Sequence, residues 1–341
     1  MARSTARRRR SRVPWLFAGL AGLVLILVAN IATWFGQGSL SYTSTARVEL
    51  PIREAGPRVG PAPSAPRRSD DLAQVPAPVE PELIETSTFG PLPIRGEDGR
   101  RPLVAYAHPF EFADPRPRVA ILLTGLGLQA DLTERAIALP SAVSLAFSPY
   151  GSQVEADIDR ARLAGHEAWL EIPMEPVDYP ESDPGPHTLL VDASRDENLG
   201  RLRWVLARAL GYVGVTGEGG RFATDGNPQP IVQELAERGV GLIGLDGDEL
   251  EPVAALAGLP FASAGLAIDT EPSVLAIDYA FARLENRALT NGYALGYAQL
   301  YPVTIERLGA WVETLDDKGL VLAPASAIVR ELAGIVPGVG G

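Results

Sequence analysis

Short apolar runs alternate with amphipathic segments from Arg118 almost to the end of the chain, and this alternation limits the fold more than any other feature. Short apolar runs are typical of buried strands, whereas the segments between them show helical periodicity. Continuous apolar strands separated by helices require a parallel sheet covered by helices. The expected strands are Val119–Leu123, Val143–Phe147, Glu167–Ile172, Tyr212–Val215, Val240–Leu245, Gly265–Ile268, Gly292–Tyr297 and Gly319–Ala323.

The repeat count, about seven or eight strands, favours an α/β fold that closes into a (β/α) barrel over residues 117–335, with a tail at 336–341. The segment Thr124–Ala130 after the first strand lacks the third glycine of a dinucleotide-binding loop, so a nucleotide cofactor is not expected. The expected helices are Leu132–Leu139, Gln153–Ala164, Glu197–Ala209, Pro230–Arg238, Ser273–Thr290 and Val303–Lys318.

The N-terminus predicts a membrane anchor. Residues 1–12 contain six arginines and precede an apolar run over residues 13–35, which is long enough to cross a hydrocarbon core of about 30 Å. Basic residues before the run predict a cytoplasmic N-terminus. A cleaved signal peptide is the alternative, but its apolar region is usually roughly 7–15 residues long. We expect a single-pass anchor in the cytoplasmic (inner) membrane and a barrel in the periplasm.

Residues 36–116 are rich in Pro, Ser, Arg and Glu and show little periodicity. Such a segment buries too little apolar surface to offset its ordering entropy, so we predict a largely disordered linker. Within it, Leu103–Phe110 is apolar enough to form a short element docked on the barrel.

The chain carries a formal net charge of −12 and contains no cysteine. Without the six arginines of residues 1–12, the remainder carries about −18. An acidic body repels phosphate groups and has no basic, aromatic stripe to offset this, so nucleic acid is not an expected partner. The absence of cysteine excludes disulfides, thiolate metal sites and cysteine nucleophiles.

Two nearby motifs, Ile172–Pro176 (Ile-Pro-Met-Glu-Pro) and Asp183–Pro186 (Asp-Pro-Gly-Pro), are unusual in sequence. Together with Ala161–Glu167 and Tyr301–Arg307, they make residues 117–335 similar to the divergent polysaccharide deacetylase family. This resemblance implies a deformed (β/α) barrel and a role in envelope carbohydrate metabolism. It also implies relatives that hold a divalent metal through one aspartate and two histidines, with a second aspartate as general base.

The residues that would hold this metal are missing at the matching positions. Thr124-Gly125 stands where the first strand of the family usually ends in two aspartates. Neither Gly214–Phe222 nor Gly296–Pro302 contains the histidine that relatives carry there. Because zinc prefers imidazole or thiolate ligands, we do not expect zinc-dependent deacetylation, and we assign no cofactor.

Carboxylates at predicted strand ends are the remaining candidates for chemistry, because parallel strands bring their carboxyl ends to one rim. They fit the paired acid and base of a carbohydrate hydrolase. A divalent cation such as calcium or magnesium, held by these oxygen ligands, is one alternative, and simple loop capping is another. The predicted catalytic residues are Glu171, Glu175, Asp246 and Asp269.

The predicted substrate-binding residues are Arg221, Glu218, Tyr179, Tyr301 and His187. The two tyrosines lie beside prolines in loops, where a flat ring stacks on a sugar face. Arg221 offers a fork of donors to a glycan carboxylate or to Glu218, with a local ion pair as the alternative. His187 follows Pro186 in a loop, and one imidazole does not complete a two-histidine metal site.

Two functions of different classes are consistent with these residues. The first is a membrane-anchored envelope protein that binds an envelope polysaccharide or peptidoglycan-type glycan, or hydrolyses it without zinc. The second is a catalytically inactive barrel that serves as an interaction module for another envelope protein.

Overall fold

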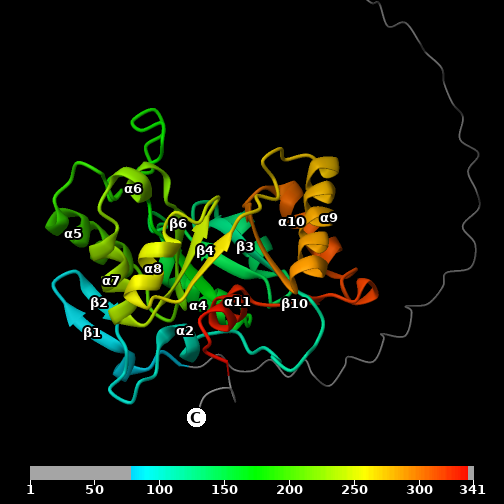
Figure 1. Ribbon diagram of the computed structural model, residues 1–341, viewed down its shortest axis with the longest axis horizontal. Coiled ribbons are helices and arrows are strands. Elements are labelled where there is room, and N and C mark those ends of the chain that lie inside the picture. The colour runs from blue at the N-terminus through cyan, green and yellow to red at the C-terminus, as the bar shows by residue number, and fades with distance from the viewer. Residues whose placement is uncertain (1–77, 337–341) are drawn as a thin grey trace, which may run out of the picture. The chain divides into compact units, whose positions relative to one another are not determined.

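The computed structural model describes residues 78–336, in which parallel strands form a barrel wrapped by helices (Figure 1). Strand β3 pairs with β9 on one side and with β4 on the other, and the sheet continues through β5, β6, β7 and β8. Short β10 pairs with the first two residues of β3. The strands are β3 (Arg118–Leu126), β4 (Ser144–Phe147), β5 (Ala168–Glu171), β6 (Gly214–Glu218), β7 (Gly241–Leu245), β8 (Phe261–Ala264), β9 (Tyr293–Gln299) and β10 (Val321–Leu322).

The barrel closes just beyond the end of β8. Ala267 forms a parallel bridge with Tyr297. The N–H of Ile268 donates to the carbonyl of Tyr297 at 2.9 Å, and the N–H of Tyr297 donates to the carbonyl of Leu266 at 3.0 Å. Strands β3 to β9 therefore form the nearly closed parallel barrel that the sequence predicts. The strand expected at Gly265–Ile268 is this bridging segment, whereas β8 itself lies earlier in the chain.

The helices cover the outer face of the barrel and bury the outward-pointing residues of the strands, such as Leu123, Leu145 and Leu170. Helix α5 begins with a reciprocal capping box between Ser194 and Glu197. The outer helices are α3 (Ala130–Ile137), α4 (Val154–Leu163), α5 (Arg195–Leu206), α6 (Gly220–Asp225), α7 (Gln229–Arg238), α8 (Glu251–Ala257), α9 (Val274–Asn291) and α10 (Pro302–Val312). The expected helix Val303–Lys318 is divided, because α10 stops early and a 3-10 turn, η2 (Asp316–Lys318), follows.

Trp169 fills the middle of the barrel. It is fully buried and belongs to the inner cluster of apolar residues, together with Leu122 and Ile243. Its indole fits because Gly214 and Gly241 face it without side chains: a Cβ atom on Gly214 would lie 2.4 Å from the Trp169 ring. The small barrel therefore accommodates one large side chain in place of several medium-sized ones.

Helix α11 (Ala325–Leu332) closes the base of the barrel, at the amino ends of the strands, and lies at the end opposite α6 in Figure 1. Its residues Ile328 and Val329 join the inner apolar cluster. Six consecutive residues of this helix, 325–330, are buried, so it lacks the polar face of an outer helix.

The carboxylate of Glu167 ties the base together. Its Oε1 accepts hydrogen bonds from the hydroxyl of Ser144 at 2.7 Å, Nε1–H of Trp169 at 3.0 Å and N–H of Ser326 at 2.9 Å. Its Oε2 accepts from the N–H of His108 at 3.3 Å and from the Ser326 hydroxyl. Although Glu167 is fully buried, these donors satisfy its charge and link four separate segments of the chain.

Part of the predicted linker is folded. Within 36–116, the described residues form η1 (Pro81–Leu83), the hairpin of β1 (Ile84–Ser87) and β2 (Gly90–Pro93), and the short helix α2 (Pro102–Ala105). Leu83, Leu92 and Leu103 are buried against the barrel. The prediction of a linker as far as residue 116 is therefore wrong for this part, because spaced leucines supply enough apolar burial.

Within residues 78–336, none of the helices has the length and apolar character that a membrane span requires. The predicted anchor at 13–35 and the basic segment at 1–12 lie outside the described residues.

The Gly214→Ala substitution should destabilise the barrel by about 1–3 kcal/mol, because the added methyl overlaps the Trp169 ring and the carbonyl of Gly241. Gly200→Ala in α5 is the matched control: its Cβ would meet Phe89 at an ordinary 3.8 Å, so it should stabilise by roughly 0.5–1 kcal/mol. Urea unfolding followed by tryptophan fluorescence measures the free energy of unfolding of both variants. Equal changes in this free energy would contradict the packing argument.

Glu167→Gln should lower the free energy of unfolding by roughly 2–4 kcal/mol, because an amide group replaces one oxygen that accepts from buried donors. Glu306→Gln, at an exposed position of α10, removes the same charge and should change stability by less than about 0.5 kcal/mol. The difference between these variants in urea unfolding separates the buried network from a general charge effect.

Candidate functional site

The mouth of the barrel, at the carboxyl ends of the strands, gathers three of the predicted acidic residues. Glu171 and Glu218 are the last residues of β5 and β6, and Asp246 directly follows β7. Because side chains alternate along a strand, Glu171 points to the same inner side as Trp169. Strands β5, β6 and β7 are direct neighbours, so these carboxylates share one sector of the mouth.

Glu171 is the most perturbed acid of this group. It is half-buried, and its Oε1 accepts a short hydrogen bond of 2.5 Å from the N–H of Gly125 at the end of β3. Burial raises the pKa of Glu171, the hydrogen bond from Gly125 lowers it, and the negative charge of Glu218 raises it, so that together these effects bring the pKa to about 7. Near neutral pH this carboxyl group exchanges between its acid and base forms, as a proton-transfer residue requires.

Negative charge at the mouth is not neutralised by basic side chains. The pKa of Glu218 is raised by loss of water around its carboxyl group, even though the residue as a whole is exposed, and then by Asp246 and Asp178. Among the ion pairs of residues 78–336, none includes these three residues or Glu171. Asp246 also has a backbone φ of 56°, in the left-handed region that non-glycine residues rarely adopt.

Glu175 and Arg221 form a structural pair. Glu175 is 3% exposed, accepts from Nη1 of Arg221 at 2.6 Å, and accepts from the N–H of Val191 at 2.8 Å. Arg221 also lies 3.5 Å from Asp225 within α6. This pair holds the loop after β5 onto α6, so Arg221 contacts Glu175 and not Glu218. The local ion pair that the sequence leaves open is the one the structure contains.

Asp269 is also structural. It is buried, and it accepts from the N–H of Gln299 at 2.9 Å and from the hydroxyl of Thr304 at 2.7 Å. Burial raises the pKa of its carboxyl group, whereas these hydrogen bonds lower it. Asp269 therefore fixes the end of β9 and the start of α10 around the mouth.

The remaining predicted glycan contacts are spread over the loops. The ring of His187 stacks on Trp204 of α5, with centroids 3.6 Å apart, and burial together with Arg201 and Arg208 lowers the pKa of His187. Tyr179 is half-buried in the loop after β5, and Tyr301 is 42% exposed where α10 begins. Tyr301 is thus available at the rim, whereas His187 is engaged in a stack.

One further residue of the mouth, Tyr297, is not among the predicted site residues. It is 6% exposed, and it follows Leu295 on the inner side of β9. Burial raises the pKa of its hydroxyl, and the charges of Asp246, Glu218 and Asp269 raise it further. Its position two residues after Leu295 in an alternating strand is the sequence signal that would identify it.

Comparison with known proteins identifies the chain. The sequence profile of the family described as divergent polysaccharide deacetylase matches residues 121–329. The chain belongs to this family. The crystal structure of an uncharacterized protein from Agrobacterium tumefaciens is 32% identical, with a TM-score of 0.68, and the match covers 70% of this chain and 99% of that one.

A second structure, a putative fructose-1,6-biphosphate aldolase from Coccidioides immitis, is 16% identical over 70% of this chain and 95% of that one. Its TM-score of 0.27 is too low to inform fold or function. No curated protein matches this chain.

The mouth of this family member does not fit the metal that the resemblance implies. At the end of β3, the Thr124 hydroxyl donates to the carbonyl of Ala298 at 3.0 Å, and Gly125 has no side chain. Within residues 78–336, no three His, Cys, Asp or Glu side chains are grouped to hold a metal ion. The alternative of a divalent cation on the carboxylates therefore also lacks a preformed ligand set in this part of the chain.

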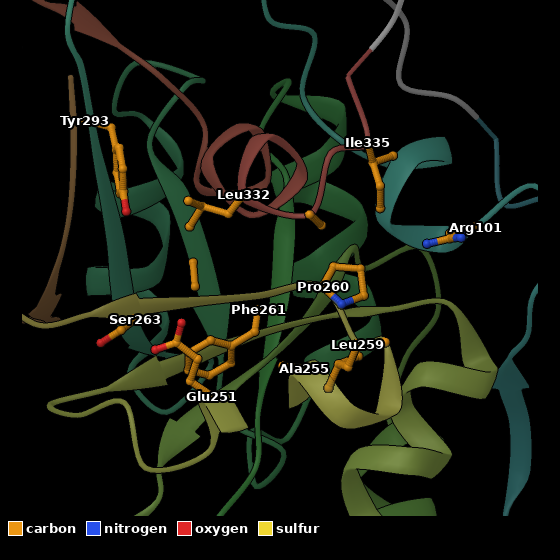
Figure 2. Close-up of a pocket in the computed structure, with 13 residues that line it drawn as sticks. Arg101, Glu251, Ala255, Leu259, Pro260, Phe261, Ser263, Tyr293, Leu332 and Ile335 are labelled. Atoms are coloured by element: carbon orange, nitrogen blue, oxygen red, sulfur yellow. The ribbon is translucent and has the colours of Figure 1, made fainter. Parts of the chain in front are cut away.

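A cavity of about 570 Å³ lies away from this mouth, near the amino ends of β8 and β9 (Figure 2). Figure 2 shows Leu332 and Ile335, from the C-terminal segment, across the opening from Phe261. The predicted site residues do not line this cavity. The acidic mouth remains the candidate functional site of this family member.

The raised pKa of Glu171 predicts that stability falls as pH increases. Between its ordinary value of 4.5 and about 7, the folded protein keeps a proton that the unfolded chain has released. The free energy of unfolding should therefore decrease by on the order of 3 kcal/mol over this range. Glu171→Gln should remove this decrease and be more stable than wild type at pH 8.

Urea unfolding of the wild type, Glu171→Gln and Glu306→Gln from pH 4 to 8 measures this effect. The Glu306→Gln profile should follow that of the wild type. Parallel profiles for wild type and Glu171→Gln would show that Glu171 titrates normally.

Proposed function

We propose that this protein is anchored in the cytoplasmic membrane and acts on an envelope glycan at the mouth of its periplasmic barrel. The observation that carries the proposal is Glu171, a half-buried carboxyl group with a pKa of about 7 beside the carboxylates of Glu218 and Asp246. Membership of the divergent polysaccharide deacetylase family supports carbohydrate as the ligand class. The apolar run at 13–35 after six arginines supports the anchor.

Hydrolysis at this site would use general acid–base chemistry. Protonated Glu171 donates its proton to the leaving atom of the glycan bond, and a neighbouring carboxylate accepts a proton from the attacking water. The N–H of Gly125, near the end of β3, donates to Oε1 of Glu171 and fixes the position of this carboxyl group. The bond to the leaving atom breaks as the water oxygen bonds to the same centre, so the reaction consumes one water molecule.

An interaction module without catalysis is the second candidate, and an exposed apolar patch favours it. Val274, Leu275 and Tyr279 of α9 are 48%, 83% and 69% exposed. They lie at the start of the helix, on the mouth side of the barrel, where another envelope protein would contact them. This candidate predicts that Leu275→Asp abolishes binding of the partner protein, whereas Glu171→Gln leaves that binding unchanged.

The test is binding and hydrolysis of defined envelope glycan fragments by the full-length protein in detergent. Glu171→Gln should reduce hydrolysis by about 100-fold or more, in line with the loss of a general acid, and leave glycan affinity within a few-fold of wild type. Glu306→Gln should behave as wild type. Binding without hydrolysis in the wild type would reduce the proposal to a glycan-binding barrel, and no binding to any fragment would refute it.

A further inference from the structure

The barrel wall is open at the amino ends of β8 and β9. Within residues 78–336, these two strands form no ladder with each other. The hydrogen bonds that close the wall lie further along, between the segment after β8 and Tyr297. The cavity of about 570 Å³ lies at the open part, where Phe261 and Tyr293 line it (Figure 2). The gap in the wall and the cavity therefore coincide.

Strand β8 presents free backbone groups to this cavity. The N–H of Leu242 in β7 donates to the carbonyl of Pro260 at 2.9 Å, and Leu242 stands in register with Phe261. Backbone groups alternate between the two edges of a strand, so the N–H and C=O of Phe261 and Ser263 point away from β7. In the described part of the chain, no hydrogen bond engages these groups. A free strand edge is a template for pairing with a further strand.

Strand β9 faces the gap in the same way. The N–H of Arg118 in β3 donates to the carbonyl of Gly292 at 2.9 Å, and Arg118 pairs with Tyr293. The N–H and C=O of Tyr293 therefore point toward β8, as those of Tyr297 do where the wall closes. Two strand edges thus border one cavity, and a peptide in extended conformation carries matching donors and acceptors along its length.

The side chains around the cavity fit the apolar residues of such a peptide. Leu259 and Phe261 line one wall, and Leu332, which is 49% exposed, lies with Ile335 across the opening from Phe261 (Figure 2). A peptide along β8 points alternate side chains to each face, where these apolar groups contact them. The volume of about 570 Å³ is within the range of roughly 300–1,000 Å³ that is typical of ligand sites.

Arg101 places a positive charge at one end of the cavity. It is half-buried, and among the described residues it has no acidic partner. Burial lowers the pKa of Arg101, and the positive charge of Arg95 lowers it further. Glu251 lies toward the other end of the cavity and is exposed to solvent (Figure 2). A carboxylate on the occupant would therefore be stabilised beside Arg101.

We propose that the base of the barrel binds an extended, acidic segment of a partner protein, which adds a strand at the open edge of β8. The backbone of the partner pairs with Phe261 and Ser263, and its carboxylate binds Arg101. Its apolar side chains contact Leu332 and Ile335. This contact lies at the amino ends of the strands, so a bound partner leaves the acidic mouth open to glycan. The inference goes beyond the proposed glycan function and does not depend on it.

The probe is a synthetic acidic strand, Glu-Thr-Val-Thr-Val-Thr, blocked at both ends, together with the reversed sequence, because a strand pairs in either direction. Each peptide is titrated into the full-length protein in detergent by calorimetry. One of them should bind with a Kd of about 100 μM or below. Hydrogen exchange measured by mass spectrometry should slow by about tenfold or more in the fragment that contains Phe261 and Ser263, and remain unchanged in α9.

Changes on both sides of the contact locate it. Methylating the alternate set of peptide nitrogens that faces β8 removes those donors and should weaken binding by about tenfold or more. Arg101→Gln should weaken binding of the peptide by about fivefold or more, and change binding of the version with Gln in place of Glu by less than about twofold. Arg283→Gln, at an exposed position of α9, removes the same charge and should leave the affinity unchanged. Urea unfolding checks that both variants are folded.

Three results would overturn the inference. The first is binding of neither peptide, including the case in which another part of the chain already pairs with β8. The second is binding that is insensitive to methylation of either alternate set, which means apolar docking without strand pairing. The third is binding of octanoate as tight as that of the peptide, which assigns the cavity to a small amphipathic anion. Glycan hydrolysis is measured separately on the same preparations, so failure of the mouth and failure of the base are distinguished.

Discussion

The buried carboxylate of Glu167 holds the base of the barrel, and the rest of the architecture depends on it. Its donors come from β4, β5, the start of α11 and the segment before β3. A fully buried charge is stable only when donors surround it, so these four segments must keep fixed positions around the Glu167 carboxylate. Strand β5, with Glu167 just before it, links the base to the mouth. Its side chains alternate, so Glu167, Trp169 and Glu171 point inward at the base, the middle and the mouth of the barrel.

Most of the parallel strands could be predicted from the sequence because their apolar runs are continuous and bounded by turns. The base could not be predicted in the same way. Helix α11 is only eight residues long, and its polar residues Ser326 and Arg330 are buried together with its apolar ones, which the sequence pattern does not indicate. Helix α6 begins at Gly220, a poor helix former, and the hairpin at 84–93 has a proline-rich composition that is typical of linkers.

The candidate site could be predicted where position in a strand decides the outcome. Glu171 and Glu218 reach the mouth because each ends a parallel strand, and Asp246 does so because it directly follows one. Glu175 and Asp269 carry the same chemical group, but their partners lie 46 and 35 residues further along the chain, at Arg221 and Thr304. The spacing of residues within a motif does not reveal such distant partners, although they determine whether a carboxylate is free or has a structural role.

Tyr297 serves the barrel in two ways at once. Its backbone makes the hydrogen bonds that close the wall between β8 and β9, and its side chain faces the acidic mouth. A ligand that contacts this side chain therefore stabilises the residue at which the barrel closes, so occupancy of the mouth and local opening of the wall are thermodynamically linked. The amide proton of Ile268, which donates to the carbonyl of Tyr297, thus becomes a reporter whose exchange with solvent slows when the mouth is filled.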